Sequence, residues 1–270
     1  LEAAEVEDCI IGAALQQGAT GGNIARQAVI RSGLPVTVAG MSVDRQCASG
    51  MMAIAVAAKQ VLHDGIDIAV GGGVESVSLV QTDKMNLSRA ADPWIKAHKP
   101  ALYMSMLETA ETVANRYGIS REAQDDYALQ SQQRTATAQA AGKLDDEIVP
   151  MTTVMKVMDR DTKQISEHEV TLSKDEGNRP STSLEGLSSL QPVHKNGQVI
   201  TEGSFITAGN ASQLSDGASA SVVMEARQAE RRGLQPLGRY VGMVAVGCEP
   251  DEMGIGPVFA VPKLLSLNGL

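Results

Sequence analysis

Aromatic side chains are scarce in this chain, because tryptophan, tyrosine and phenylalanine together make up only 3% of its 270 residues. Such a sequence is poorly equipped to stack the bases of a nucleic acid. Positive charge is also short, since 23 Lys and Arg face 32 Asp and Glu and the net charge is −9. A negative net charge opposes binding to the negatively charged phosphate backbone of a nucleic acid. We therefore expect no nucleic-acid partner, although a local basic pocket for one phosphorylated cofactor is compatible with this charge.

Cysteine is equally rare. Cys9, Cys47 and Cys248 are odd in number and far apart, so they imply no disulfide framework. The chain has no CxxC or HExxH spacing and its four histidines are scattered, so we predict no metal site. No apolar run approaches the ~20 residues that span a bilayer, and the acidic N-terminal residues lack signal-peptide form. These absences favour a reducing cytoplasm, or an organellar matrix in a eukaryote, and no membrane partner.

The core must be built from aliphatic side chains, because 43% of the residues are hydrophobic and twelve are methionine. Over residues 8–80, strand-like and helix-like patterns alternate. We expect strands at residues 8–14, 36–43 and 67–70, and helices at residues 23–32 and 47–63, the first capped by Asn23. This alternation predicts a mainly parallel sheet covered by helices, and hence an α/β fold.

The pattern changes after about residue 81, and residues 82–204 indicate an inserted α+β subdomain. Helices are expected there at residues 106–117 and 121–141, the second with Ser120 as its N-cap. Sheet patterns return at residues 205–210 and 218–224. They are followed by a helix at residues 226–232, a strand at 237–246 and a last helix near 257–268.

Cys47 opens the second expected helix, directly after a strand. A thiol at a helix N-terminus lies against the positive end of the macrodipole and several unpaired backbone N–H groups. This environment favours the thiolate, which is the nucleophilic form of cysteine. A small buried hydrophobic residue is the alternative, and the local pattern alone does not decide between the two.

Three further segments are candidates for ligand contact. Gly71-Gly72-Gly73 lacks the GxGxxG spacing of a dinucleotide loop, so we expect these glycines to let the strand pass close to another backbone. Residues 175–183 place Arg179 in a turn-rich loop, and residues 207–218 gather small residues where strands end. Together, the backbone N–H groups, a hydroxyl and an arginine of these two loops could bind a thioester that carries a nucleotide. Either loop taken alone is compatible with an ordinary solvated turn.

Six segments together carry a resemblance: Asp44–Gly50, Gly71–Ser76, Thr109–Ala114, Ser120–Asp125, Asp145–Pro150 and Thr207–Gly217. In their order and spacing, the chain resembles the thiolase family over essentially its whole length. Residues 175–187 have the form of the 3-ketoacyl-CoA type within that family. The resemblance implies a layered α/β/α fold with an inserted α+β loop domain. It also implies an N-terminal half at residues 1–81 and 205–233, the loop domain at 82–204, and the start of a C-terminal half at 234–270.

The resemblance further implies an acetyl-CoA C-acyltransferase, in which Cys47 takes the acyl group of a 3-ketoacyl-CoA and passes it to CoA. The positions that match contacts to CoA or the acyl chain are Arg179, Ala208, Ala211, Ser212, Met106 and Ser105. Acetoacetyl-specific thiolases carry a histidine at the position of Ser105, so broader chain lengths are favoured. CoA and acyl-CoA are then substrates rather than permanent cofactors, and the resemblance implies a homodimer or homotetramer.

Part of the family pattern is not in this sequence. Thiolases use a second cysteine, a histidine and an asparagine from C-terminal loops, and the resemblance places these beyond Leu270. Cys248 lacks the CxGGG context of the second cysteine. The alternative is therefore a truncated, inactive module that binds CoA or a partner, and we expect the 270 residues alone not to catalyse thiolysis.

Overall fold

The computed structural model describes all of residues 1–270, and the chain forms two compact units. Residues 1–103 and 214–270 form the first unit, and residues 104–213 form the second. The first unit is thus built from both ends of the chain. The three-part division expected from the sequence, with a loop domain at residues 82–204, stays a prediction.

The first unit contains a four-stranded sheet in the order β2 (Ala39–Val43), β1 (Asp8–Gly12), β3 (Ile68–Glu75) and β6 (Gly217–Met224). Strand β1 pairs in parallel with both β2 and β3, whereas β6 runs antiparallel to β3. In this register Ile10 lies between Met41 and Gly71. The mainly parallel sheet expected from the sequence is confirmed, with one antiparallel strand at its edge.

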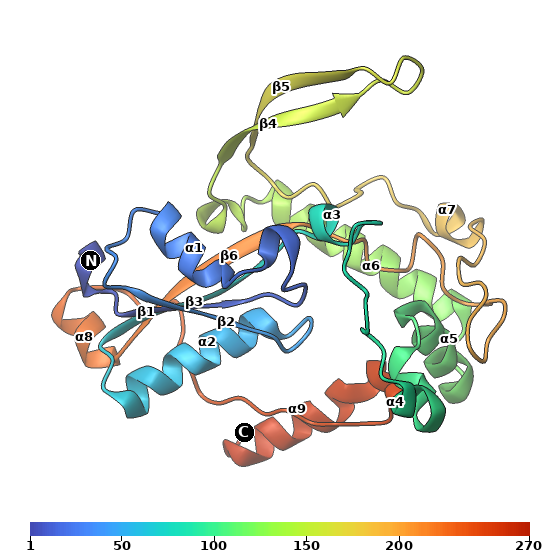
Figure 1. Ribbon diagram of the computed structural model, residues 1–270. Coiled ribbons are helices and arrows are strands. Elements are labelled where there is room, and N and C mark those ends of the chain that lie inside the picture. The colour runs from blue at the N-terminus through green and yellow to red at the C-terminus, as the bar shows by residue number, and fades with distance from the viewer. The chain divides into compact units, whose positions relative to one another are not determined.

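Two helices cover opposite faces of this sheet (Figure 1), namely α1 (Ile24–Arg31) and α2 (Ser49–Lys59). The sequence of β1 explains the arrangement. Cys9 and Ile11 belong to a core cluster with Val29 of α1, whereas Ile10 belongs to a cluster with Ala53 of α2. Because successive strand side chains point to opposite faces, an apolar strand of this kind fits between two helical layers. The layered α/β class is confirmed.

Glycines allow α2 to lie very close to the sheet. A Cβ on Gly71 of β3 would lie 2.7 Å from the Cα of Ile54 in α2. A Cβ on Gly12, at the end of β1, would lie 2.1 Å from the carbonyl carbon of Ser49. Side chains cannot be accommodated at such distances. The close backbone approach expected for the glycine run at residues 71–73 is therefore confirmed.

Helix ends follow the capping signals in the sequence. The side chain of Asn23 accepts a hydrogen bond from the N–H of Arg26, and that of Ser120 accepts one from the N–H of Ala123. The helix expected at residues 47–63 is shorter, because α2 covers Ser49–Lys59. A π-helical turn follows at Gln60–Asp64, and Gly65 ends it with a left-handed φ of 77°.

The first unit contains four further α-helices: α3 (Val77–Val80), α4 (Pro93–His98), α8 (Ala226–Arg231) and α9 (Gly256–Leu267). The last of these is largely apolar, yet none of its residues is buried. No helix in the chain combines the length and hydropathy required to cross a membrane.

The second unit contains helices α5 (Met106–Tyr117), α6 (Arg121–Ala140) and α7 (Leu184–Ser188), and a hairpin of β4 (Met151–Met158) and β5 (Ile165–Leu172). Ser105 caps α5, and Gly118 ends it with a φ of 64°. The two long helices expected in this region are confirmed. The α+β composition expected for the inserted part is also present.

Two expected strands are wrong. At residues 205–210, the N–H groups of Phe205 and Ile206 donate to the carboxylate of Glu111 instead of to a strand, and only Thr207 forms an isolated bridge, with Pro192. At residues 237–246 the chain has no strand neighbour and forms no regular structure. A strand needs a run of backbone partners for its N–H and C=O groups. Residues 205–210 have only this one bridge, and residues 237–246 have no strand neighbour.

Candidate functional site

Cys47 lies in the short turn between β2 and α2, beyond the carboxyl end of a parallel strand. Open α/β sheets bind ligands at that edge. Its side chain is exposed, which excludes the interpretation of Cys47 as a buried hydrophobic residue. Helix α2 begins at Ser49, however, so the expectation that Cys47 opens the helix is wrong. Ala48 explains the offset, because its φ of −89° and ψ of 7° are not helical and it stands as the N-cap of α2.

The turn that carries Cys47 is held by hydrogen bonds. The hydroxyl of Ser49 accepts from the N–H of Arg45 at 2.8 Å and donates to the carbonyl of Gln46 at 2.5 Å. The N–H groups of Ala48 and Ser49 donate to the carbonyls of Arg45 and Gln46. These two N–H groups are therefore not unpaired, contrary to the expectation. The turn is a fixed support for an exposed thiol.

Two carboxylates hold the neighbouring loops at the same edge of the sheet. Glu75, at the end of β3, accepts from the N–H groups of Ala14 and Leu15 at 2.8 and 3.2 Å. Asp216 accepts from the hydroxyl and the N–H of Ser78, which hold the pKa of Asp216 below its usual range. Sequence reasoning missed both roles. The sequence signal for these roles is an acidic residue beside a segment of small residues: Glu75 follows the glycine run at residues 71–73, and Asp216 precedes the small residues at 217–221.

In the second unit, Arg179 has a fixed backbone and a free side chain. Its N–H donates to the side-chain oxygen of Gln132 at 2.8 Å, and its carbonyl accepts from the N–H and hydroxyl of Thr182 at 3.0 and 2.7 Å. The residue is exposed, and its guanidinium makes no hydrogen bond or ion pair within residues 1–270. An arginine in this state is available to an anion.

The segment 207–212 forms a compact turn around Asn210. The side-chain oxygen of Asn210 accepts from the N–H of Thr207 at 2.8 Å, and its side-chain nitrogen donates to Asp125 at 2.9 Å and to the carbonyl of Phe205 at 3.0 Å. Ala211 closes the turn by donating its N–H to the carbonyl of Thr207. Asn210, which the sequence did not single out, therefore fixes the turn to helix α6.

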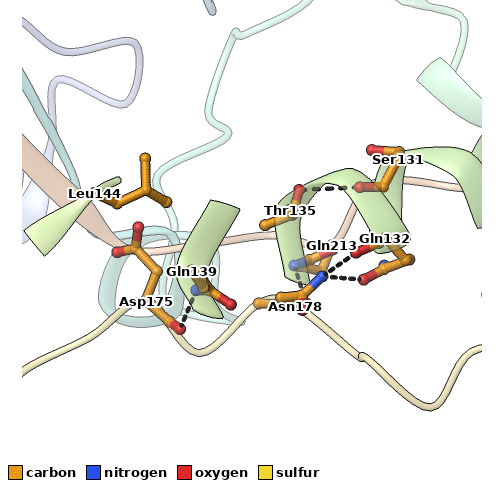
Figure 2. Close-up of a pocket in the computed structure, with 9 residues that line it drawn as sticks. Ser131, Gln132, Thr135, Gln139, Leu144, Asp175, Asn178 and Gln213 are labelled. Carbon is orange, nitrogen blue, oxygen red and sulfur yellow. Dashed lines mark hydrogen bonds between the residues drawn. The ribbon is translucent and has the colours of Figure 1, made fainter. Parts of the chain in front are cut away.

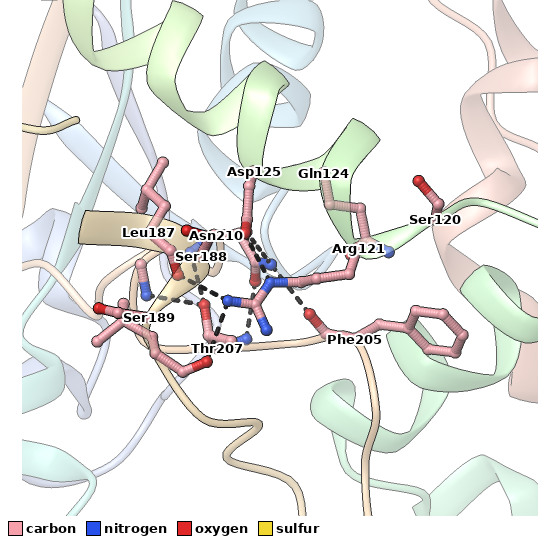
Figure 3. A network of polar contacts seen from close by, with 12 residues as sticks. Ser120, Arg121, Gln124, Asp125, Leu187, Ser188, Ser189, Phe205, Thr207 and Asn210 are labelled. Carbon is pink, nitrogen blue, oxygen red and sulfur yellow. Dashed lines mark hydrogen bonds and ion pairs between the residues drawn. The ribbon is translucent and has the colours of Figure 1, made fainter. Parts of the chain in front are cut away.

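Figure 3 shows how Asp125 is itself held. The guanidinium of Arg121 pairs with Asp125 at 2.8 Å and donates to the carbonyls of Leu187 and Leu190 at 2.7 and 3.1 Å. Asp125 is only 1% exposed. A buried carboxylate needs such partners, because an unpaired charge in the interior is costly. The ion pair lies within α6, and the two further hydrogen bonds of Arg121 link the beginning of α6 to the end of α7 and the residues that follow it.

Two further buried carboxylates, Glu108 and Glu111, lie three residues apart on one face of α5. Glu108 accepts from the N–H groups of residues 198–200 at 2.6–3.0 Å, and Glu111 from those of residues 204–206 at 2.8–3.1 Å. Burial raises the pKa of Glu108, but these N–H groups outweigh it, with a smaller contribution from His194, and the net pKa is lowered. The carboxylates thereby hold the chain that leads into residues 207–212.

The remaining predicted site residues also lie in the second unit. Ala208 and Ser212 are exposed and Ala211 is half-buried. Ser105 uses its hydroxyl to cap α5, accepting from the N–H of Glu108 at 3.2 Å, and Met106 beside it is 64% exposed. Cys47 belongs to the first unit and the six other predicted residues to the second. Within the second unit, the segments of Arg179 and Ser212 are brought together through Gln213.

A cavity of about 250 Å³ lies between α6 and residues 175–178 (Figure 2). Its lining is mainly neutral and polar, with amide side chains from Gln132, Gln139, Asn178 and Gln213. None of the predicted site residues lines it. The cavity therefore marks where the loop preceding Arg179 rests on α6, and it is not the predicted site itself.

Sequence similarity to known proteins identifies the family. Residues 1–227 match the family described as "Thiolase, N-terminal domain". The chain belongs to the thiolase family. It is 41% identical over 265 residues to a 3-ketoacyl-CoA thiolase of Bacillus subtilis, covering 98% of this chain and 66% of the relative. The recognition made from the six sequence segments is confirmed.

Eukaryotic members of the thiolase family are similarly close. The peroxisomal 3-ketoacyl-CoA thiolase A of Mus musculus is 43% identical over 271 residues, covering 100% of this chain and 61% of the relative. The peroxisomal enzyme of Homo sapiens is 42% identical over 267 residues, covering 98% and 60% respectively. The chain thus spans about three fifths to two thirds of the length of these relatives.

Proposed function

We propose that the whole protein is an acetyl-CoA C-acyltransferase that exchanges acyl groups between 3-ketoacyl-CoA and CoA, with Cys47 as the nucleophile. The observation that carries the proposal is an exposed thiol on a hydrogen-bonded turn at the carboxyl edge of a parallel sheet. The names of the similar proteins support this reaction type. A reducing cytoplasmic or organellar compartment and a homo-oligomeric state belong to the same proposal.

In the proposed reaction, the sulfur of Cys47 attacks the keto carbon of a 3-ketoacyl-CoA. The bond between the second and third carbons breaks, and its electron pair leaves on the enolate of acetyl-CoA, which then takes up a proton. The shortened acyl group remains on Cys47 as a thioester. The thiolate of a second CoA attacks this thioester, releases the new acyl-CoA and restores the thiolate of Cys47. The reverse sequence is a Claisen condensation.

Residues 1–270 would supply the nucleophile and part of the CoA site. Arg179 would bind a phosphate of CoA, because a guanidinium pairs well with phosphate oxygens and this one has no internal partner. The turn at residues 207–212 would contact CoA through Ala208, Ala211 and Ser212, while Ser105 and Met106 would line the path of the acyl chain. The proton donor and acceptor would come from the part of the family pattern that this sequence lacks.

The first test asks whether Cys47 is the reactive thiol. Brief treatment with iodoacetamide followed by peptide mapping should label Cys47 well before Cys9 and Cys248. Cys9 is buried, and burial raises the pKa of its thiol, whereas Cys248 is half-buried. Equal labelling of all three cysteines would count against the assignment.

The second test asks whether Cys47 carries an acyl group. Incubation of the whole protein with acetoacetyl-CoA should add one acetyl group to the peptide that contains Cys47, as measured by mass spectrometry. The variant Cys47→Ala should lose both this adduct and thiolysis, whereas the matched variant Cys248→Ala should retain both. A whole protein that binds CoA but never acylates Cys47 would instead be the inactive CoA-binding module considered from the sequence.

A further inference from the structure

The two segments predicted to bind CoA are joined by one side chain. Gln213 follows Ser212 directly, and its side-chain nitrogen donates to the carbonyl of Gly177 at 3.0 Å. Gly177 in turn lies two residues before Arg179. Resting on the proposed function, we propose that Gln213 is a positioning residue that sets the guanidinium of Arg179 relative to the turn at residues 207–212.

The approach of Gln213 depends on the glycine it contacts. A Cβ at position 177 would lie 2.3 Å from the side-chain nitrogen of Gln213. Because the clash involves the end of a flexible side chain, an alanine at position 177 would displace the amide rather than unfold the unit. The bridge can therefore be broken from either side, by changing Gln213 or by changing Gly177.

Helix α6 supports the same loop at other points. The side-chain oxygen of Gln132 accepts from the side chain of Asn178 at 2.8 Å (Figure 2). It also accepts from the N–H of Arg179 at 2.8 Å. Gln139 donates to the carbonyl of Asp175 at 3.3 Å. These contacts fix the loop to α6, and Asn210 fixes the turn at residues 207–212 to the same helix through Asp125. Gln213 adds a direct hydrogen bond between the two segments, which restrains the loop on the side that faces the turn.

The consequence for binding follows from preorganisation. An exposed arginine loses side-chain freedom when it binds an anion, and a mobile backbone would add to that loss. Residues 175–180 are exposed or half-buried and contain no regular secondary structure, so their order depends on these side-chain contacts. Loss of the hydrogen bond from Gln213 to Gly177 should therefore weaken the binding of a phosphate-bearing ligand to Arg179, while the second unit keeps its fold.

The experiment measures CoA affinity of the whole protein by calorimetry, with thermal unfolding as a check of folding. Gln213→Glu keeps the shape but replaces the donor by an acceptor that faces a carbonyl, and Gly177→Ala breaks the same bond without a charge change. Each should weaken CoA binding about three- to tenfold, the size expected for one lost hydrogen bond. Gln164→Glu, an exposed change of the same charge in the hairpin turn, should leave affinity unchanged.

The decisive readout is the double variant with Arg179→Ala. If Gln213 acts through Arg179, Gly177→Ala should cost little further affinity once Arg179 is removed. Three results would overturn the positioning role. They are losses of CoA affinity that add in the double variant, a loss in Gln164→Glu as large as that in Gln213→Glu, and unchanged CoA affinity in both Gln213→Glu and Gly177→Ala. Unchanged affinity in Arg179→Ala alone would instead overturn the proposed CoA contact, so the two failures are distinguishable.

Discussion

Glu108 and Glu111 show how single residues organise the second unit. Each carboxylate accepts from successive backbone N–H groups that would otherwise require a neighbouring strand. A buried N–H group without a partner would cost about 1–3 kcal/mol. The two glutamates therefore hold residues 198–200 and 204–206 against α5 without a neighbouring strand. The turn that carries the predicted CoA contacts depends on this arrangement.

Glu108→Gln tests this role. An amide can replace only one of the two carboxylate oxygens and sets its NH₂ group against a backbone N–H, so we expect a loss of ~2–3 kcal/mol in the free energy of unfolding at neutral pH. The pKa of Glu108 is lowered by folding, so its contribution is fully present above the ordinary value of 4.5 and is lost as pH falls through the folded pKa. Denaturant titrations should therefore show a smaller acid-induced loss in the variant.

The control for this change is Glu185→Gln, an exposed glutamate in the same unit. It should alter neither the stability at neutral pH nor its dependence on acid. If Glu108→Gln and Glu185→Gln behave alike, Glu108 does not hold residues 198–200 in the way the contacts indicate.

At the level of elements, close contact between α2 and the sheet determines where the Cys47 turn lies. Glycine at the end of β1 and along β3 brings the helix backbone almost onto the strands. The buried residues of this alanine-rich helix are all small, namely Ser49, Ala53, Ala55, Ala57 and Ala58, so they do not keep it away from the sheet. The packing of these backbones therefore places the exposed thiol, so a substitution outside the turn, at a glycine of the sheet, should displace α2 and with it the turn.

Gly71→Ala should destabilise the first unit. Its Cβ would lie 2.7 Å from the Cα of Ile54, so the backbone of α2 must move, at a cost of ~1–3 kcal/mol typical of overpacking. Gly217→Ala is the matched control, since it lies in the same sheet and its Cβ would meet nothing within 4 Å. Urea unfolding should separate the two variants. Equal stabilities would show that α2 does not need this close approach.

At the level of the whole molecule, residues 1–270 leave apolar surface uncovered. Helix α9 has no buried residue, with Val258 and Phe259 exposed by 65% and 47%. The outer edges of β2 and β6 have no strand partner. Exposed apolar faces and open sheet edges favour association between chains.

A purified 270-residue chain should therefore associate as its concentration rises, as measured by light scattering after size-exclusion chromatography, and should show no thiolysis of acetoacetyl-CoA. Phe259→Glu should reduce the association, because it places a charge on the apolar face of α9. Lys263→Gln on the same helix changes the net charge by the same amount but adds no charge among the apolar side chains, so it should not reduce the association. A monomer at all concentrations would contradict the expectation, and robust turnover would require a base within these residues.

The sequence by itself determined the elements whose signals are local. Strand β1 is a continuous apolar run and α5 and α6 have serine caps, so both kinds of element could be predicted. The family could also be recognised, because short motifs keep their order along the chain. These features depend on neighbouring residues and are readable without knowing the fold.

Only the tertiary structure decided the features that depend on distant residues. Residues 205–210 carry a strand pattern, but their N–H groups donate to Glu111, which lies more than ninety positions earlier. Ala48, whose non-helical conformation delays the start of α2 to Ser49, is a residue type that favours helices, so no local signal predicts the delay. The bridge from Gln213 to Gly177 likewise joins residues 36 positions apart. A pattern along the chain records hydrophobicity and local propensity, whereas the partner of a polar group is fixed only when the chain has folded.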